Sequence, residues 1–245
     1  MRSDQTAITM NTPTLLPHPD PSSPVLSHFS LLGKTAVVTG GTRGIGLEVS
    51  RGLAEAGASV AILYTSTEPS AADEIAASIS KSTGQLVKAY KADVTSATEI
   101  GDTINAITSD IFKGHLDIVV ANAGIATHYA AEDYTPEQFQ EIMNVNLNGA
   151  FYTAQAGGRI FKEQFSKTGK QGRVIFTASV SATLVNVPQK QSAYNASKAA
   201  VVQLARCLSV EWVGFARVNC ISPVRMSDNM MTDKANSMLG IHCYR

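Results

Sequence analysis

Short apolar runs alternate with longer amphipathic stretches from Leu32 onward, and this alternation is the strongest pattern in the chain. The runs are nearly continuous in apolar residues, as is typical of parallel strands buried on both faces. They occupy residues 34–39, 58–63, 86–90, 116–120, 173–178 and 216–221. Helical patterns fill the intervals, roughly at 45–56, 70–82, 96–112, 136–157 and 193–213. Six strands alternating with five helices predict an α/β fold with a doubly wound parallel sheet.

Residues 1–30 do not share this alternation. They are rich in Pro, Ser and Thr and show no helical or strand period, so we expect a flexible tail. A transit peptide is the alternative, but Asp4 and Asp20 argue against it, and Arg2 is the only arginine of the segment. We therefore expect a tail over residues 1–30 and a single domain over residues 31–245.

Composition and charge narrow the classes of function. The chain has 20 basic and 20 acidic residues, and this balance offers no electrostatic grip on nucleic acid or on an anionic membrane. No apolar run reaches the roughly 18 residues that a membrane-spanning helix needs. Cys207, Cys220 and Cys243 are scattered, and the five histidines lack ligand spacing. We expect no metal site, and reduced thiols in a cytoplasmic protein.

A glycine-rich turn, TGGTRGIG at residues 39–46, directly follows the first predicted strand. Gly40 allows a sharp turn, Gly44 allows the backbone to approach a pyrophosphate, and Gly46 allows the next helix to pack close to the sheet. That helix would point its positive N-terminal end at the phosphates. A dinucleotide site of the Rossmann type is therefore predicted. The residues expected to bind it here are Gly40, Thr42, Arg43, Gly44, Ile45 and Gly46.

The end of the second predicted strand indicates which dinucleotide is bound. An NAD site usually places a carboxylate there to hold the ribose 2′-hydroxyl. This chain has Tyr64, Thr65 and Ser66 instead, and we expect Tyr64 and Ser66 to line the site. Arg43 in the glycine turn can offer a planar, charged fork to a 2′-phosphate. We therefore expect NADP(H) rather than NAD(H).

Two further strand ends belong to the same crevice, because ligands of open α/β sheets bind at the carboxyl ends of the strands. Asp93 and Val94 follow the third strand, where a short acid can bond to an adenine amino group. Asn122, Ala123 and Gly124 follow the fourth, where small residues let a ribose and nicotinamide pass close to the backbone. Either group of residues alone would be typical of an ordinary turn after a strand.

Taken together, these residues resemble the short-chain dehydrogenase/reductase family. The matching pieces are TGGTRGIG, ANAG with Asn122, NVNLNG (144–149), TASVSA (177–182) and YNASK (194–198). They occur in the family's order over about residues 30–223. The stretches around LYTST and YNASKAA look most like the fungal and yeast NADPH-dependent branch, which includes mannitol dehydrogenases, sorbose and xylulose reductases and carbonyl reductases.

The resemblance assigns Tyr194 as the acid/base that protonates a carbonyl oxygen, or deprotonates an alcohol in the reverse direction. A free phenol has a pKa of about 10, too high for efficient exchange at neutral pH. Lys198 stands four residues on, on the same helix face, and its charge is expected to lower that pKa by roughly one to three units. The resemblance also has Lys198 hold the nicotinamide ribose, so both residues bind cofactor as well.

Two further roles come from the resemblance. Ser179 corresponds to the serine that orients the substrate carbonyl, with Ser181 as the alternative. Asn146 corresponds to the asparagine that holds a proton-relaying water near the lysine, with Asn144 as the less favoured choice. Ser179 stands at the end of the fifth predicted strand, and Asn146 lies within the helix predicted over 136–157.

The chain departs from the family pattern after Ile221. Pro223 still matches a cofactor-contacting residue, but Val224 stands where the family has glycine. No strand-like run follows, and the chain ends at Arg245, sooner than the pattern does. We expect a truncated C-terminal strand and substrate lid, an exposed edge on the sixth strand, and altered subunit contacts.

The expected activity is reversible, NADPH-dependent reduction of a ketose or other small ketone to a secondary alcohol. A ketoreductase of fungal secondary metabolism is an alternative within the enzymes. A second alternative is an NADP(H)-binding protein whose shortened C-terminus impairs catalysis. The resemblance also implies a homodimer or homotetramer that binds a small carbonyl or alcohol, without nucleic acid or membrane partners.

Overall fold

The computed structural model describes residues 22, 24–224 and 239–242, the last four through their backbone. Most of the expected tail, the expected substrate-covering segment and Cys243 therefore lie outside the described residues. Of the tail's last part, Val25–Phe29 forms a 3₁₀ helix whose apolar side chains are exposed. No helix in the described ranges is both long and apolar enough to cross a membrane.

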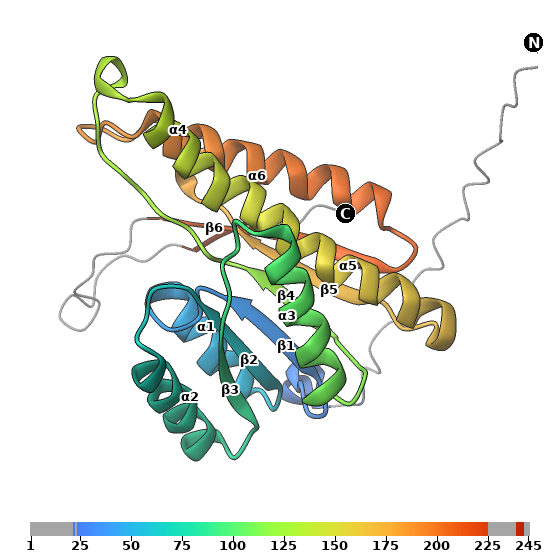
Figure 1. Ribbon diagram of the computed structural model, residues 1–245. Helices are drawn as coiled ribbons and strands as arrows, with labels where there is room; N and C mark the ends of the chain where they lie inside the picture. Colours follow the sequence, from blue (N-terminus) through green and yellow to red (C-terminus); the bar gives the residue numbers. More distant parts are fainter. Residues whose placement is uncertain (1–21, 23, 225–238, 243–245) are drawn as a thin grey trace, which may run out of the picture.

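Within the described ranges, seven strands form one sheet in the order β3-β2-β1-β4-β5-β6-β7 (Figure 1). Strands β1 to β6 are parallel, and each lies within two residues of its predicted position. Their bounds are β1 Thr35–Thr39, β2 Ser59–Tyr64, β3 Val87–Lys91, β4 Ile118–Ala121, β5 Gly172–Thr177 and β6 Ala216–Pro223. The predicted doubly wound parallel sheet is thus confirmed, with its strand order reversing between β1 and β4.

Helices cover the sheet in two layers, because successive strand residues point to opposite faces. Val37 belongs to the core beneath α3, α5 and α6, while its neighbours Ala36 and Val38 belong to the core beneath α1 and α2. Figure 1 shows the two layers on either side of the strands. The bounds are α1 Gly44–Glu55, α2 Pro69–Thr83, α3 Ala97–Asp110, α4 Pro136–Met143, α5 Gly149–Thr168 and α6 Ser192–Glu211.

The prediction that no strand follows Ile221 is wrong. Strand β6 continues to Pro223, and β7 (Leu239–His242) pairs with it in antiparallel orientation. The pairing covers only Cys220–Pro223, so β7 adds no partner to the first half of β6. The sequence of β7, LGIH, lacks the continuous apolar run by which the other strands were recognised, and its partner strand supplies most of its stabilisation.

The helix expected over 136–157 is longer and interrupted. Helix α4 passes into a π-helical turn at Asn144–Asn148, which continues directly into α5 and runs to Thr168. The predicted end at residue 157 lies inside α5, next to the pair Gly157–Gly158. A Cβ on Gly157 would press against Val119, and one on Gly158 against the Trp212 ring, so these glycines serve close packing.

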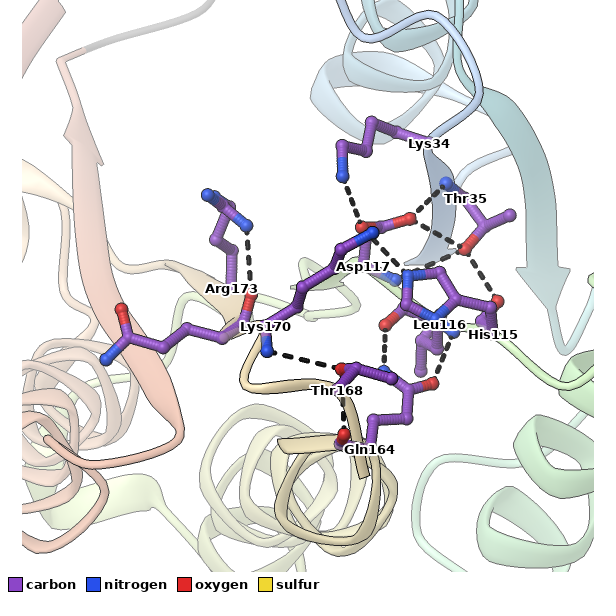
Figure 2. A network of polar contacts seen from close by, with 10 residues as sticks. Lys34, Thr35, His115, Leu116, Asp117, Gln164, Thr168, Lys170 and Arg173 are labelled. Atoms are coloured by element: carbon purple, nitrogen blue, oxygen red, sulfur yellow. Dashed lines mark hydrogen bonds and ion pairs between the residues drawn. The ribbon is translucent and has the colours of Figure 1, made fainter. Parts of the chain in front are cut away.

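The buried carboxylate of Asp117 joins the N-terminal ends of β1 and β4 (Figure 2). This end of the sheet is opposite to the one that carries the glycine turn. Asp117 accepts hydrogen bonds from Lys34 Nζ at 2.8 Å and from the Thr35 backbone N–H at 3.1 Å, and His115 Nε2 lies 3.2 Å away. Burial raises the pKa of Asp117, but the bonds from Lys34 and Thr35 and the charges of His115 and Lys34 outweigh it and lower the pKa overall.

Asp117→Asn should therefore destabilise the fold by about 1–3 kcal/mol at neutral pH, because charged hydrogen bonds are lost in a buried position. Since the folded pKa is depressed, the wild-type advantage is present above the unfolded pKa and disappears as the pH falls through the folded pKa. Denaturant unfolding of both proteins from neutral to acid pH measures this. An undiminished difference in strong acid would contradict the assignment.

Candidate active site

The glycine turn has the geometry that the sequence predicted for a phosphate loop. Gly40 and Gly44 have φ of 64° and 54°, in the left-handed region that favours glycine. A Cβ on Gly46 would overlap the Gly40 carbonyl oxygen and the Asn122 amide. Asn122 Nδ2 donates to the carbonyl oxygens of Thr39 and Gly40 at 3.0 and 3.3 Å, which fixes the turn against the end of β4.

The start of α1 is open to an anion. No side chain caps this helix, whose N-cap residue is Arg43, and a Cβ on Gly44 would meet no atom within 4 Å. Arg43 and Gly44 are exposed and Ile45 is partly buried, while Thr42 is buried and its hydroxyl bonds to that of Thr67 at 2.8 Å. The turn therefore presents unpaired helix N–H groups and one cation to the same space.

The ends of β2 and β3 open onto a groove of about 810 Å³. Thr65 and Asp93 line it, and Ser66 is exposed beside Thr65, but Tyr64 is buried beneath them. Asp93 Oδ1 accepts from the backbone N–H and hydroxyl of Thr95 at 2.9 and 2.8 Å. The groove's remaining lining comes from Thr95 and from Pro136, Glu137, Gln140, Glu141, Asn144 and Val145.

The same strand ends also contain predicted residues that serve packing. Val94 is buried, and its side chain and backbone oxygen leave no room for a Cβ on Gly149 at the start of α5. The backbone N–H of Ala123 donates to the Thr39 hydroxyl at 3.1 Å, which links β4 to β1. Pro223 is buried at the end of β6, where it pairs with Leu239.

Asn146 is buried in the π-helical turn and holds the segment after β4. Its Oδ1 accepts from the Ile125 backbone N–H at 2.8 Å, and its Nδ2 donates to the Ile125 carbonyl at 2.9 Å and to Ser197 Oγ at 3.0 Å. A Cβ on Gly124 would lie 3.2 Å from Asn146 Oδ1 and 3.4 Å from Lys198 Nζ. Asn144 instead bonds to Gln140 and Asn148 within its own helix. The π turn is what points Asn146 inward.

Ser179 and Tyr194 lie together at the carboxyl end of β5. The Ser179 side chain lies close enough to the Tyr194 phenol to lower its pKa, and Ser179 is buried. Ser181, the alternative, directs its hydroxyl to Asn186 Oδ1 at 2.7 Å. Of the two serines, Ser179 therefore has the geometry to share a carbonyl oxygen with Tyr194.

Lys198 is buried on the Tyr194 face of α6. Its Nζ lies 5.8 Å from the Tyr194 ring centroid and donates to the Thr177 carbonyl oxygen at 2.7 Å. Burial lowers the pKa of Lys198 to about 8, although the nearby Cys220 thiol acts to raise it. The ammonium thus stays mostly protonated at neutral pH while facing the space beside Gly124.

The expectation that Lys198 leaves Tyr194 with a lowered pKa is not met in the protein alone. Burial raises the pKa of Tyr194, and the nearby Ser179 side chain only partly offsets this. The physical reason is that desolvation disfavours the phenolate, while the ammonium is directed at the Thr177 carbonyl. Tyr194 is therefore held as a protonated phenol, ready to donate.

Two residues at the site were not predicted. Ser197 is fully buried and joins Asn146 to the Tyr194 carbonyl, to which its hydroxyl donates at 2.7 Å. Thr177 has a buried hydroxyl that makes no hydrogen bond within the described part of the chain. Ser197 stands inside the YNASK motif and Thr177 begins the TASVSA motif, so membership of these motifs was the only signal for either residue. No cluster of three metal-ligating side chains occurs among the described residues.

Comparison with known proteins agrees with this geometry. The family model described as short chain dehydrogenase matches residues 34–239, which is most of the chain. The chain belongs to this family. It is therefore an oxidoreductase, and the matched residues include strands β1 to β6 and helices α1 to α6.

Individual short-chain dehydrogenases give a closer view. The chain is 44% identical to the sorbose reductase of Schizosaccharomyces pombe over 198 residues, covering 80% of this chain and 74% of that protein. It is 39% identical to the NADP-dependent mannitol dehydrogenase of Hypocrea jecorina over 211 residues, covering 85% and 76%. The structure of an NADPH-dependent 3-quinuclidinone reductase from Rhodotorula rubra superimposes with a TM-score of 0.77 and 40% identity, covering 90% and 81%.

The residues of the site also fit a nicotinamide dinucleotide. The uncapped α1 start and the open space at Gly44 suit a pyrophosphate. At the other end, Gly124 leaves a narrow space bounded by Asn146 and Lys198. The two ends are joined by Asn122, which bonds to the glycine turn two residues before Gly124. A bound dinucleotide could thus run from the turn to Tyr194.

Proposed function

We propose that this short-chain dehydrogenase reduces a small ketone to a secondary alcohol with NADPH, reversibly. The observation that carries the proposal is the meeting of Ser179, Tyr194 and Lys198 beside the glycine turn, with Asn146 bracing the strand end next to them. A phenol, a hydroxyl and a buried ammonium around one open space suit proton transfer to a developing alkoxide.

Each side chain has a role that its surroundings support. Ser179 donates a hydrogen bond to the substrate carbonyl oxygen, and Tyr194 gives that oxygen its proton. We expect Lys198, whose ammonium lies 5.8 Å from the Tyr194 ring centroid, to stabilise the phenolate that remains after proton transfer. Asn146 keeps Gly124 and Ile125 at the correct distance from α6 through Ser197. A nicotinamide, when bound, supplies the hydride; the water proposed for Asn146 remains a prediction from the family.

Arg43 supports NADPH over NADH, since it is exposed beside the phosphate turn and the end of β2 offers Thr65 and Ser66 rather than a carboxylate. We expect Arg43→Ala to weaken NADPH binding about tenfold, because a charged hydrogen bond to the 2′-phosphate is lost. NADH binding should change little. Titration of both cofactors by fluorescence measures this, and an equal loss for the two would remove the argument.

The substrate class we favour is a ketose/polyol pair, because relatives at this level of identity are named as sorbose reductase and mannitol dehydrogenase. The test is a panel of fructose, sorbose, xylulose and aryl ketones with purified protein and NADPH, followed by nicotinamide absorbance. Turnover of a ketose is the expected result. Turnover of aryl ketones alone would favour a ketoreductase of another pathway, and tight NADPH binding without any turnover would favour a binding protein.

A further inference from the structure

Four polar side chains join the loop after β5 to the first turn of α6, and we call Ser181, Asn186, Gln191 and Asn195 the amide network. Gln191 is its centre and is buried, with 8% of its surface exposed. Gln191 Nε2 lies 2.8 Å from Asn186 Oδ1, 3.0 Å from Asn195 Oδ1 and 3.3 Å from Ser181 Oγ. Asn195 Nδ2 in turn donates to the Leu184 carbonyl at 3.1 Å.

The amide network is connected to both hydroxyls of the proposed reaction. The Ser181 backbone N–H donates to Ser179 Oγ at 3.1 Å, so Ser181 fixes the rotamer of Ser179. Asn195 directly follows Tyr194 in the first turn of α6. The network therefore spans from the strand end that carries Ser179 to the helix turn that carries Tyr194.

Hydrogen bonds, rather than apolar burial, hold the loop between them. The apolar side chains of this loop, Leu184, Val185 and Val187, are 59%, 85% and 85% exposed and contribute little packing. The contacts of Asn186 Oδ1 with Ser181 and Gln191 are short and partly buried. Leaving such polar groups without a partner costs folding free energy. Loss of Gln191 would remove the N–H donors that face Asn186 Oδ1 and Asn195 Oδ1, leaving Asn186 Oδ1 with Ser181 as its remaining close donor and weakening the attachment of the loop to α6.

We propose that Gln191 is a positioning residue that keeps Ser179 and Tyr194 at the separation at which both hydroxyls contact one carbonyl oxygen. The inference rests on the proposed function, since it assigns Gln191 to the same site. Gln191 touches neither hydroxyl itself and acts through Ser181 and Asn195. It also shapes the loop that borders the substrate, so its loss should affect the ketone more than the cofactor.

The test compares two buried glutamines of one fold. Gln191→Met removes the amide and keeps the volume. Gln164→Met is the matched control, because Gln164 is 9% exposed and bridges the Leu116 N–H and C=O, both at 2.7 Å, far from the site (Figure 2). We expect similar losses of thermal stability but a kcat about tenfold lower for Gln191→Met alone, with NADPH affinity unchanged. Asn195→Ala should reproduce the loss, and the double variant should lose no more.

A second measurement does not depend on turnover. Tyrosine labelled at Cζ reports the titration of Tyr194 by NMR, with Tyr194→Phe to assign the signal. Because the Ser179 side chain lowers the pKa of Tyr194, releasing Ser179 should raise that pKa further in Gln191→Met, while Lys198 on the same face is unchanged. Absence of turnover in the wild type would refute the proposed function and leave this titration as the test. A Gln191→Met protein that matches Gln164→Met in kcat and in Tyr194 titration overturns the inference.

Discussion

Tyr194→Phe should lower kcat for ketone reduction by about 10²–10⁴-fold, which is the contribution expected of a positioned general acid. The substitution removes only the hydroxyl group, and the ring keeps its place near Lys198, with its centroid 5.8 Å from the ammonium. Burial raises the pKa of Tyr194 and so keeps its hydroxyl protonated. Phenylalanine at this position has no proton to donate to the substrate oxygen. Steady-state kinetics with NADPH and the ketose that the wild type turns over fastest give the measurement.

A control for this prediction lies on β3. Tyr90 also has a pKa raised by burial, but it is remote from Ser179 and Lys198 in the sheet order. Tyr90→Phe should leave kcat within about twofold, because a perturbed pKa alone does not make a residue catalytic. NADPH affinity should be kept in both variants. Retained turnover in Tyr194→Phe would require another proton donor and would refute the assignment.

Gly46→Ala should weaken NADPH binding about a hundredfold and destabilise the fold by about 1–3 kcal/mol. The added methyl would overlap the carbonyl oxygen of Gly40 and the amide of Asn122, neither of which can move without distorting the phosphate turn. The first turn of α1 would shift away from the sheet, and with it the N–H groups that face the phosphates. Calorimetric titration and thermal unfolding report the two effects separately.

The same substitution elsewhere in α1 should have the opposite effect. A Cβ on Gly52 would meet no atom within 4 Å, and Gly52 has ordinary helical geometry. Gly52→Ala should therefore stabilise the protein by roughly 0.5–1 kcal/mol and leave NADPH binding intact, since alanine loses less backbone entropy in a helix. A Gly46→Ala protein that behaves like Gly52→Ala would show that close packing at the turn is unimportant.

Most of the sheet could be predicted because burial on both faces leaves a simple signal in sequence. The central strands contain runs such as Ala36–Val37–Val38, in which successive residues meet the core on one face and then on the other. Strand β7 left no such signal, since glycine and histidine interrupt its apolar residues and its pairing depends on β6. The helix end predicted at residue 157 was too early, and the close packing of Gly157 and Gly158 inside α5 against Val119 and Trp212 depends on residues distant in sequence.

The candidate site divides in the same way. Some residues lie together because of their spacing in the sequence or their place at a strand end, and these juxtapositions could be predicted. Tyr194 and Lys198 share one helix face, and Asn122 lies beside the glycine turn. Properties set by surroundings were not predictable. The direction of the pKa shift of Tyr194 depends on burial, and the burial of Tyr64 depends on the packing around the end of β2. The resemblance supplied roles, but only the fold could supply these environments.

The interrupted helix from Pro136 to Thr168 bears on which changes of chain length the protein can accept. A π turn holds one residue more than an α turn, so removing one residue from Asn144–Asn148 would restore ordinary helical bonding and leave α5 in register, with Phe161 and Ala154 still in the core. The loss would instead fall on the turn itself, where the inward position of Asn146 and its bonds to Ile125 would disappear. Variation among relatives should therefore take the form of substitutions at this turn and of insertions or deletions only beyond Thr168, where the chain is free to adjust.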